Sequence, residues 1–126
     1  MTGERGEYVT AWHRKLSKGG ASHVRFDNKP TEVRVVLSGE IDMQCRPRFA
    51  EVLGEIRAGP LRDVTVDMAG VSFVSSEGLG FLVSLHEQSI EIGGALTVLD
   101  PPRLVIRALE LTGLKDLFTI ARTSQP

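Results

Sequence analysis

Hydrophobic residues recur at two spacings along this chain, every second position in some segments and every third or fourth in others. Alternating or continuously apolar segments predict strands, whereas positions i, i+3, i+4 and i+7 predict one face of a helix. Strands are predicted at 22–26, 31–37, 63–68 and 95–99, and helices at about 47–58, 77–92 and from Asp100-Pro101-Pro102 to Gly113. A polar turn at 27–30 makes the first two strands an antiparallel hairpin, and a turn is expected at Ala69-Gly70. The last apolar segment, 117–121, either adds a strand or packs on the sheet edge.

The order of these elements predicts the fold class. Strands that alternate with helices imply crossover connections and a mostly parallel sheet, which the opening hairpin makes mixed. We therefore expect an α/β fold, with a mixed, mostly parallel sheet of four to five strands and helices packed on it. Residues 1–22 are rich in Gly, Lys, Arg and Glu and predict a flexible extension. Residues 23–122 form the predicted domain, and 123–126 a short tail.

The predicted helix at 77–92 is apolar over a wider arc than docking on a sheet requires. One row of apolar positions is expected to pack on the sheet, and a second row beside it holds Phe81, Leu85 and Ile92. A second row must pack on a neighbouring helix or stay exposed as a contact surface. We interpret Phe81 and Leu85 as part of a contact surface, with burial against another helix of the chain as the alternative.

Composition excludes several classes of function. The 126 residues have 41% hydrophobic and 25% charged content, as in an ordinary globular domain. A formal net charge of −1 gives no electrostatic footprint for nucleic acid or an anionic membrane. No apolar run approaches the roughly 18 residues of a membrane span, and the N-terminus does not resemble a signal peptide. With a single cysteine, Cys45, these features favour a cytoplasmic protein without an internal disulfide.

No pattern in the chain predicts catalysis. The three histidines lack metal-ligand spacing, and neither a phosphate-binding glycine loop nor a dinucleotide-binding glycine motif occurs. Cys45 has no histidine partner, and a lone cysteine is more often packing than nucleophile. We therefore expect no enzyme activity, no metal and no cofactor.

Two adjacent serines, Ser75 and Ser76, stand immediately before the helix at 77–92. A serine in this place ordinarily acts as an N-cap, because its hydroxyl accepts a bond from an unpaired first-turn amide. The same place also suits a phosphate, since the amides and the helix dipole favour negative charge. The neighbouring sequence decides between a serine that only caps the helix and a serine that also carries a phosphate.

Three motifs, in order, resemble those of the STAS domain, the sulfate transporter and anti-sigma factor antagonist family. G-E-I-D at 39–42 is similar to the family's G-E-[LI]-D. V-D-M-A-G-V-S-F-V-S-S-E-G-L-G at 66–80 resembles V-D-L-S-G-V-x-F-[IM]-D-S-[ST]-G-L-G. L-E-L-T-G-L at 109–114, followed by L-F at 117–118, resembles the family's closing motif. The resemblance runs from about Val24 to Phe118 and implies a single STAS-like domain.

The resemblance also implies a function. Soluble single-domain members bind an anti-sigma factor that is also a serine kinase, and thereby release a sigma factor for RNA polymerase. The kinase inactivates them by phosphorylating one serine, and a serine phosphatase restores them. The register of the motif places this phosphorylation site at Ser76. The partner-binding surface is then expected to hold Asp42, Met43, Ser75, Glu77, Phe81 and Leu85 beside it.

This chain departs from the family motif on both sides of Ser76. Ser75 stands where the family has Asp, and Glu77 stands where it has Ser or Thr. Glu77 sets a fixed negative charge beside any phosphate, which disfavours phosphorylation by about 1 kcal/mol at an exposed site. Ser75 is the alternative site of phosphorylation. The alternative function is that of a non-phosphorylated STAS adaptor in a transport or stress-signalling complex. The sequence leaves open a homodimer and the identity of the anti-sigma and sigma factors.

Overall fold

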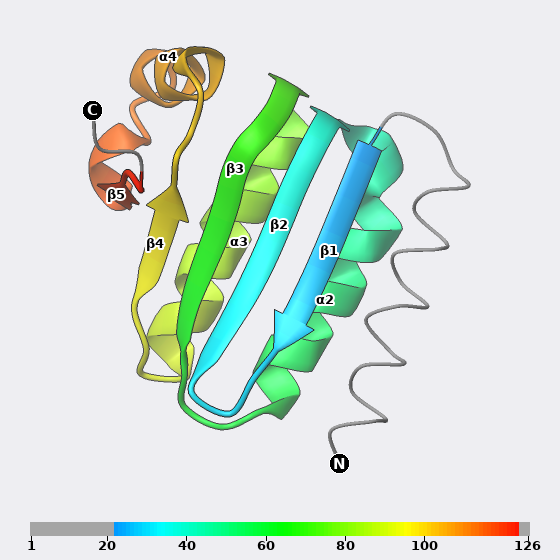
Figure 1. Cartoon of the computed structure of the whole chain (residues 1–126), viewed down its shortest axis with the longest axis vertical. Coiled ribbons are helices and arrows are strands. Elements are labelled where there is room, and N and C mark those ends of the chain that lie inside the picture. Colours follow the sequence, from blue (N-terminus) through cyan, green and yellow to red (C-terminus); the bar gives the residue numbers. More distant parts are fainter. Residues whose placement is uncertain (1–21, 124–126) are drawn as a thin grey trace.

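Five strands form one sheet in the order β1-β2-β3-β4-β5 in the computed structural model, which describes residues 22–123 (Figure 1). β1 pairs antiparallel with β2, and the other neighbours are parallel. The mixed, mostly parallel sheet predicted from the sequence is confirmed, and the predicted extension at 1–22 lies almost entirely outside the described residues. The strands are β1 (Ser22–Asn28), β2 (Glu32–Ile41), β3 (Asp63–Val74), β4 (Leu96–Leu99) and β5 (Thr119–Ala121).

Helices cover one face of this sheet. The two longest, α2 and α3, lie side by side behind β1, β2 and β3, and α4 lies beside the carboxyl ends of β3 and β4 (Figure 1). Within residues 22–123, no helix combines the length and apolar character needed to cross a membrane. The helices are η1 (Met43–Cys45), α2 (Arg46–Ala58), α3 (Ser76–Glu91), α4 (Arg103–Leu111) and η2 (Lys115–Leu117).

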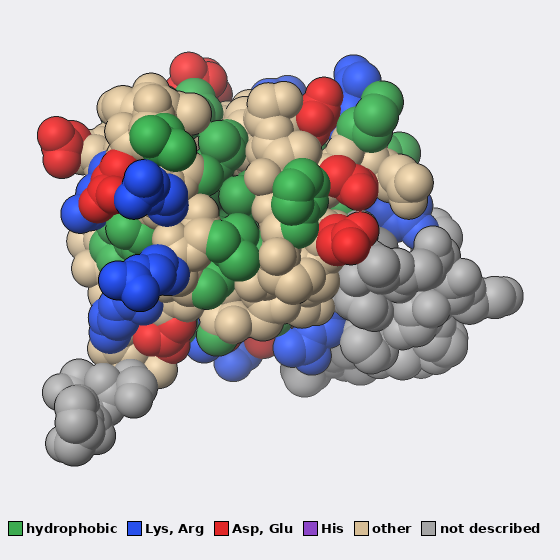
Figure 2. All heavy atoms as spheres, turned by 90° about the horizontal axis from the view of Figure 1, so that it is seen from above, with side chains coloured by type: hydrophobic (Ala, Val, Ile, Leu, Met, Phe, Trp, Pro, Cys, Tyr) green, Lys and Arg blue, Asp and Glu red, His purple; other side chains and the backbone are tan. Residues whose placement is uncertain are grey.

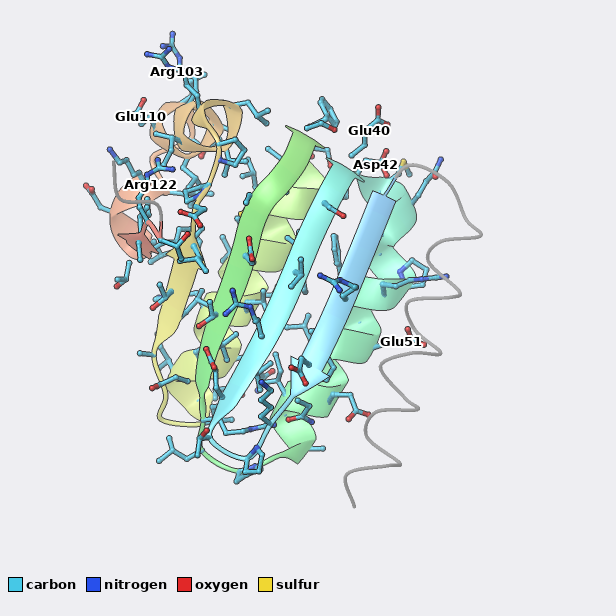
Figure 3. All side chains as sticks on the ribbon, in the orientation of Figure 1. Glu40, Asp42, Glu51, Arg103, Glu110 and Arg122 are labelled. Atoms are coloured by element: carbon cyan, nitrogen blue, oxygen red, sulfur yellow. The ribbon has the colours of Figure 1, made fainter. Side chains whose placement is uncertain are left out.

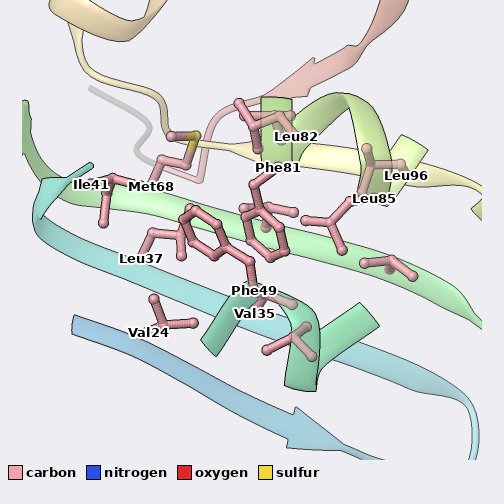
Figure 4. Close-up of a cluster of buried hydrophobic side chains, with 14 of the residues drawn as sticks. Val24, Val35, Leu37, Ile41, Phe49, Met68, Phe81, Leu82, Leu85 and Leu96 are labelled. Carbon is pink, nitrogen blue, oxygen red and sulfur yellow. The ribbon is translucent and has the colours of Figure 1, made fainter. Parts of the chain in front are cut away.

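The core lies between the sheet and the pair α2 and α3. Alternate residues of β2 and β3 point into it, and α2 contributes Phe49, Val52 and Ile56 at the predicted helical spacing (Figure 4). Burying large apolar side chains contributes about 1.5–3 kcal/mol each before the entropy cost of ordering them. The apolar face predicted for the helix after Pro47 is therefore the face that holds α2 on the sheet.

The expectation that Phe81 and Leu85 form an exposed contact surface is wrong. Phe81 is 3% exposed and Leu85 is 0% exposed. The Phe81 ring stacks on Phe49 of α2, with ring centroids 3.9 Å apart and planes 6° from parallel (Figure 4). The second apolar row of α3 faces α2 because the two helices share one face of the sheet. Phe81 and Leu85 are core residues.

The turn expected at Ala69-Gly70 is also wrong, because β3 continues to Val74. Parallel pairing with β2 carries it past this point, with Ser38 beside Gly70 and with register shifts after Val36 and after Gly39. Gly39 has φ +74°, a backbone conformation that glycine adopts without strain. The two irregularities let both strands run on to end together at Ile41 and Val74.

The last segment of the described chain is fixed by Asp100. This residue has φ +52° and donates its N–H to Ala121 O at 2.8 Å. Its carboxylate accepts from the Thr123 hydroxyl (2.5 Å) and the Thr123 N–H (2.9 Å). These two bonds lower the pKa of Asp100 below the ordinary value of an aspartate, the bond from the hydroxyl having the larger effect. The positive charge of Arg122 lowers this pKa further.

We expect an NMR titration of the Asp100 carboxyl carbon to give a midpoint below the ordinary value of an aspartate. Because folding lowers this pKa, the contact stabilises the protein above about pH 3.9, the unfolded value. The contribution is lost as the pH falls through the lower native pKa. Thr123→Ala should raise the midpoint while leaving the backbone bond in place. A midpoint at or above the ordinary value of an aspartate in the native protein would contradict this assignment.

Candidate functional site

The carboxyl ends of β2 and β3 bring two sequence motifs together. Glu40 pairs with Phe73 across the parallel strands, and Ile41 pairs with Val74. The N–H of Ser75 donates to Ile41 O at 2.9 Å. The hydrogen bonding between the two segments therefore extends to the residue that follows β3. Residues 39–42 and 71–76, some thirty positions apart, therefore form a single edge. Parallel α/β sheets commonly place their binding sites at this edge.

The two serines at this edge have different roles. Ser75 is the N-cap of α3, and its half-buried hydroxyl accepts from Gly78 N–H at 3.4 Å. Ser76 is the first residue of α3 and is exposed. Both hydroxyls donate to Glu77 Oε1, at 3.2 Å from Ser75 and 3.4 Å from Ser76. Ser75 is thus engaged with the helix backbone, whereas Ser76 faces solvent.

Asp42 and Met43 lie just beyond the end of β2. Asp42 is half-buried and caps η1, because its Oδ1 accepts from Gln44 N–H at 3.0 Å. Met43 follows it with 60% of its surface exposed. Figure 3 shows Glu40 and Asp42 close together at the carboxyl end of β2. Asp42 therefore shapes the turn, and Met43 and Glu40 present side chains to solvent.

Phe73 is an exposed residue of this edge that sequence reasoning did not identify. It is 50% exposed although it sits near the end of a core strand. Alternation from the buried Val71 would place it inside. The register shift between Gly39 and Glu40, across which β3 advances from Val71 to Phe73, breaks this alternation, and Phe73 lies outside. Seen from above, hydrophobic and acidic side chains lie next to each other on this face (Figure 2). We call it the strand-end surface, formed by Glu40, Asp42, Met43, Phe73, Ser75, Ser76 and Glu77.

Close packing under this surface depends on Gly78. A Cβ at Gly78 would lie 2.7 Å from Val74 Cγ2 and 3.0 Å from both Ile41 Cγ2 and Ile41 O. The glycine lets the first turn of α3 approach the ends of both strands. Since one of these neighbours is a backbone oxygen, relief of the clash requires the helix to move.

We expect Gly78→Ala to destabilise the protein by about 1–3 kcal/mol, the usual cost of overpacking. Gly80→Ala is the matched control, because a Cβ there meets nothing within 4 Å. That change should stabilise α3 by up to about 1 kcal/mol, since alanine is the better helix former. Thermal melts of both variants check the difference. Equal melting temperatures would show that α3 does not need the close approach.

Among residues 22–123, no group of three or more His, Cys, Asp or Glu is placed to hold a metal ion. Cys45 is buried, and His86 makes an edge contact with Phe118 at 5.8 Å between ring centroids. What the strand-end surface presents is an apolar patch, acidic side chains and one exposed serine at a helix N-terminus. The exposed serine therefore lies among apolar and acidic side chains at this edge of the sheet.

Comparison with known proteins identifies the family of this chain. Residues 23–125 match the STAS domain, and the chain belongs to that family. An anti-sigma-B factor antagonist of Staphylococcus aureus is 34% identical over 86 residues, which are 68% of this chain and 80% of that protein.

Solved structures share the fold. An anti-sigma factor antagonist from Mycobacterium paratuberculosis has a TM-score of 0.67 and 26% identity, over 80% of this chain and 86% of that one. SpoIIAA, also an anti-sigma factor antagonist, gives a TM-score of 0.70 in its unphosphorylated form, at 18% identity over 81% of this chain and 89% of that one. The phosphorylated form of SpoIIAA gives a TM-score of 0.59 at 17% identity, over 81% of this chain and 92% of that one.

Proposed function

We propose that this protein is an anti-sigma factor antagonist, which binds an anti-sigma factor with serine kinase activity and so releases a sigma factor. The observation that carries the proposal is the exposed Ser76 within the apolar and acidic strand-end surface. The names of the S. aureus and M. paratuberculosis relatives support it. On this proposal the protein acts by binding rather than by catalysis.

The surface predicts the chemistry of the partner. Met43 and Phe73 are the large apolar side chains exposed on it, and Glu40, Asp42 and Glu77 supply negative charge. Apolar anchors provide most of the energy of such interfaces, and charge steers association and selects partners. We expect the anti-sigma factor to present an apolar pocket rimmed by Lys or Arg.

We propose Ser76 as the phosphorylation site, with Ser75 as the lesser alternative. Ser76 is exposed, whereas the Ser75 hydroxyl caps α3 and is half-buried. A phosphate at Ser76 would add about −1.5 to −2 charge in the middle of the contact face. It would break the interface because the phosphate would have to be desolvated within a contact that is anchored by apolar side chains. That SpoIIAA exists in a phosphorylated form supports a switch of this kind, which a serine phosphatase would reverse.

Glu77 should slow this phosphorylation. Its Oε1 lies 3.4 Å from the Ser76 hydroxyl, so a phosphate there would face a carboxylate at close range. Glu77→Gln removes the charge and keeps a hydrogen-bond acceptor in place. With an effective cost of about 1 kcal/mol, the variant should be phosphorylated about fivefold faster.

Incubation with ATP and each anti-sigma-type kinase of the same genome, followed by intact-mass analysis and peptide mapping, tests the proposal. We expect one phosphate on Ser76, absent from Ser76→Ala and retained in Ser75→Ala. A phosphate on Ser75 would keep the switch and move the site by one residue. Stable complexes without any phosphate would favour the second candidate function, a non-phosphorylated STAS adaptor in a transport or stress-signalling complex. The contact of Glu77 with both serine hydroxyls is the observation that favours this second candidate.

A further inference from the structure

Helix α4 exposes two leucines on its outer face. Leu104 is 39% exposed and Leu111 is 75% exposed, while Val105 and Leu109 pack into the core. Residues seven apart lie about two turns from each other on the same side of a helix. Leu104 and Leu111 therefore form the two exposed ends of an apolar stripe, and Ala108 between them packs partly against the core. Figure 1 shows α4 at an outer corner, with its far side uncovered by the other described elements.

The charges beside this stripe run against the helix dipole. Arg103 is the first residue of α4 and Arg107 follows it one turn later, while Glu110 lies in the last turn. The first turn has no acidic residue and the last turn no basic one. Helices favour negative charge at the N-terminus and positive charge at the C-terminus. The charges of α4, in a single copy of the protein, therefore oppose its own dipole. Lys115 reaches Glu110 at 3.4 Å, but both side chains of this pair are about half exposed, so water weakens the attraction.

We propose that α4 is the docking surface for a second copy of this chain, in an antiparallel pair of α4 helices around a two-fold axis. In such a pair Leu104 of one copy lies opposite Leu111 of the other. An axis perpendicular to both helices also brings the same flank of each helix together. At a rise of 1.5 Å per residue, Glu110 then falls between Arg103 and Arg107 of the second copy, about 3 Å along the axis from each.

The pairing explains both unusual features of α4. Each basic N-terminal half lies against the acidic C-terminal half of the other copy, which relieves the conflict with the two helix dipoles. Figure 3 shows Arg103 and Glu110 directed outward, where a second copy can reach them. A single nine-residue helix per copy buries less than a standard interface, so the dimer is weak and reversible. The inference does not depend on the proposed function, because α4 contributes no residue to the strand-end surface.

Sedimentation velocity over a range of concentrations tests the apolar part of the proposal. We expect the wild-type protein to form a dimer at about 100 μM, and Leu111→Asp to raise the dissociation constant at least tenfold. Leu61→Asp is the matched control, because Leu61 is 65% exposed but lies outside α4. A wild-type protein that stays monomeric would overturn the proposal. So would equal effects of the two variants, which would place the contact elsewhere.

A mixing experiment tests the pairing of charges between copies. Arg103→Glu sets like charges opposite each other in its own dimer, and Glu110→Arg does the same with the opposite sign. We expect each variant alone to associate at least fivefold more weakly, and an equal mixture to recover heterodimers. Residues 103 and 110 are about 10 Å apart along one helix, so the recovery has to arise between copies. A mixture that associates no better than its components would overturn the antiparallel pairing, provided that both variants keep their thermal melts.

Discussion

Phe81→Asp should abolish the cooperative thermal melt of this protein. Phe81 is 3% exposed and its ring stacks at 3.9 Å on Phe49, at the centre of the contact between α2 and α3. Loss of the ring alone, as in Phe81→Ala, costs about 3–5 kcal/mol through the cavity it leaves. The aspartate adds a buried, unpaired carboxylate to that cavity. Since small domains are stable by about 5–15 kcal/mol, the two costs together should unfold the protein.

Circular dichroism melts of Phe81→Asp and Phe73→Asp make the comparison direct. Both variants replace a phenylalanine by an aspartate, but Phe73 is 50% exposed. Phe73→Asp should keep a cooperative melt within a few degrees of wild type. A normal melt for Phe81→Asp would instead show that the ring is not part of the core.

Phe73→Asp should weaken binding of the anti-sigma factor by at least 2 kcal/mol, about thirtyfold. Large aromatic residues at the centre of an interface commonly cost this much when they are removed. The new carboxylate would also lie beside Glu40, its neighbour across the strands, and add negative charge where a partner would have to desolvate it. Isothermal titration calorimetry with the folded variant measures the loss.

Ile90→Asp is the control for this second prediction. Ile90 is 63% exposed, near the C-terminal end of α3 and remote from the serines at its start. Its replacement should change the affinity by less than about 0.5 kcal/mol. Equal losses for Phe73→Asp and Ile90→Asp would indicate a general effect on the protein and not a specific contact at the strand-end surface.

The fold was predictable from the sequence because its elements have clear periods. The apolar face of α2, the antiparallel hairpin and the alternation of later strands with helices each follow from local spacing. Phe81 and Leu85 were misplaced for a physical reason. The width of an apolar arc shows that α3 has two partners, but it does not show whether the second is another helix of the same chain or a different protein.

The site was predictable only in part. A serine N-cap follows from residue type and position, but the sequence did not show which of the two serines it is. The structure shows that it is Ser75, because α3 begins at Ser76. Phe73 was missed because two register shifts between β2 and β3 break the alternation on which strand prediction depends. The sequence also left both serines open as possible sites of phosphorylation. The structure separates them by exposure and by the bond that Ser75 accepts from Gly78, neither of which spacing can provide.

The affinity of one anti-sigma factor for this protein, with and without a phosphate on Ser76, tests the central claim most directly. We expect a stable complex with the unmodified protein and at least a hundredfold weaker binding after phosphorylation, about 2.7 kcal/mol. Ser76→Ala should bind like the unmodified protein after the same kinase treatment. Equal affinity of the phosphorylated and unmodified proteins would contradict the account, because Ser76 would then lie outside the contact surface.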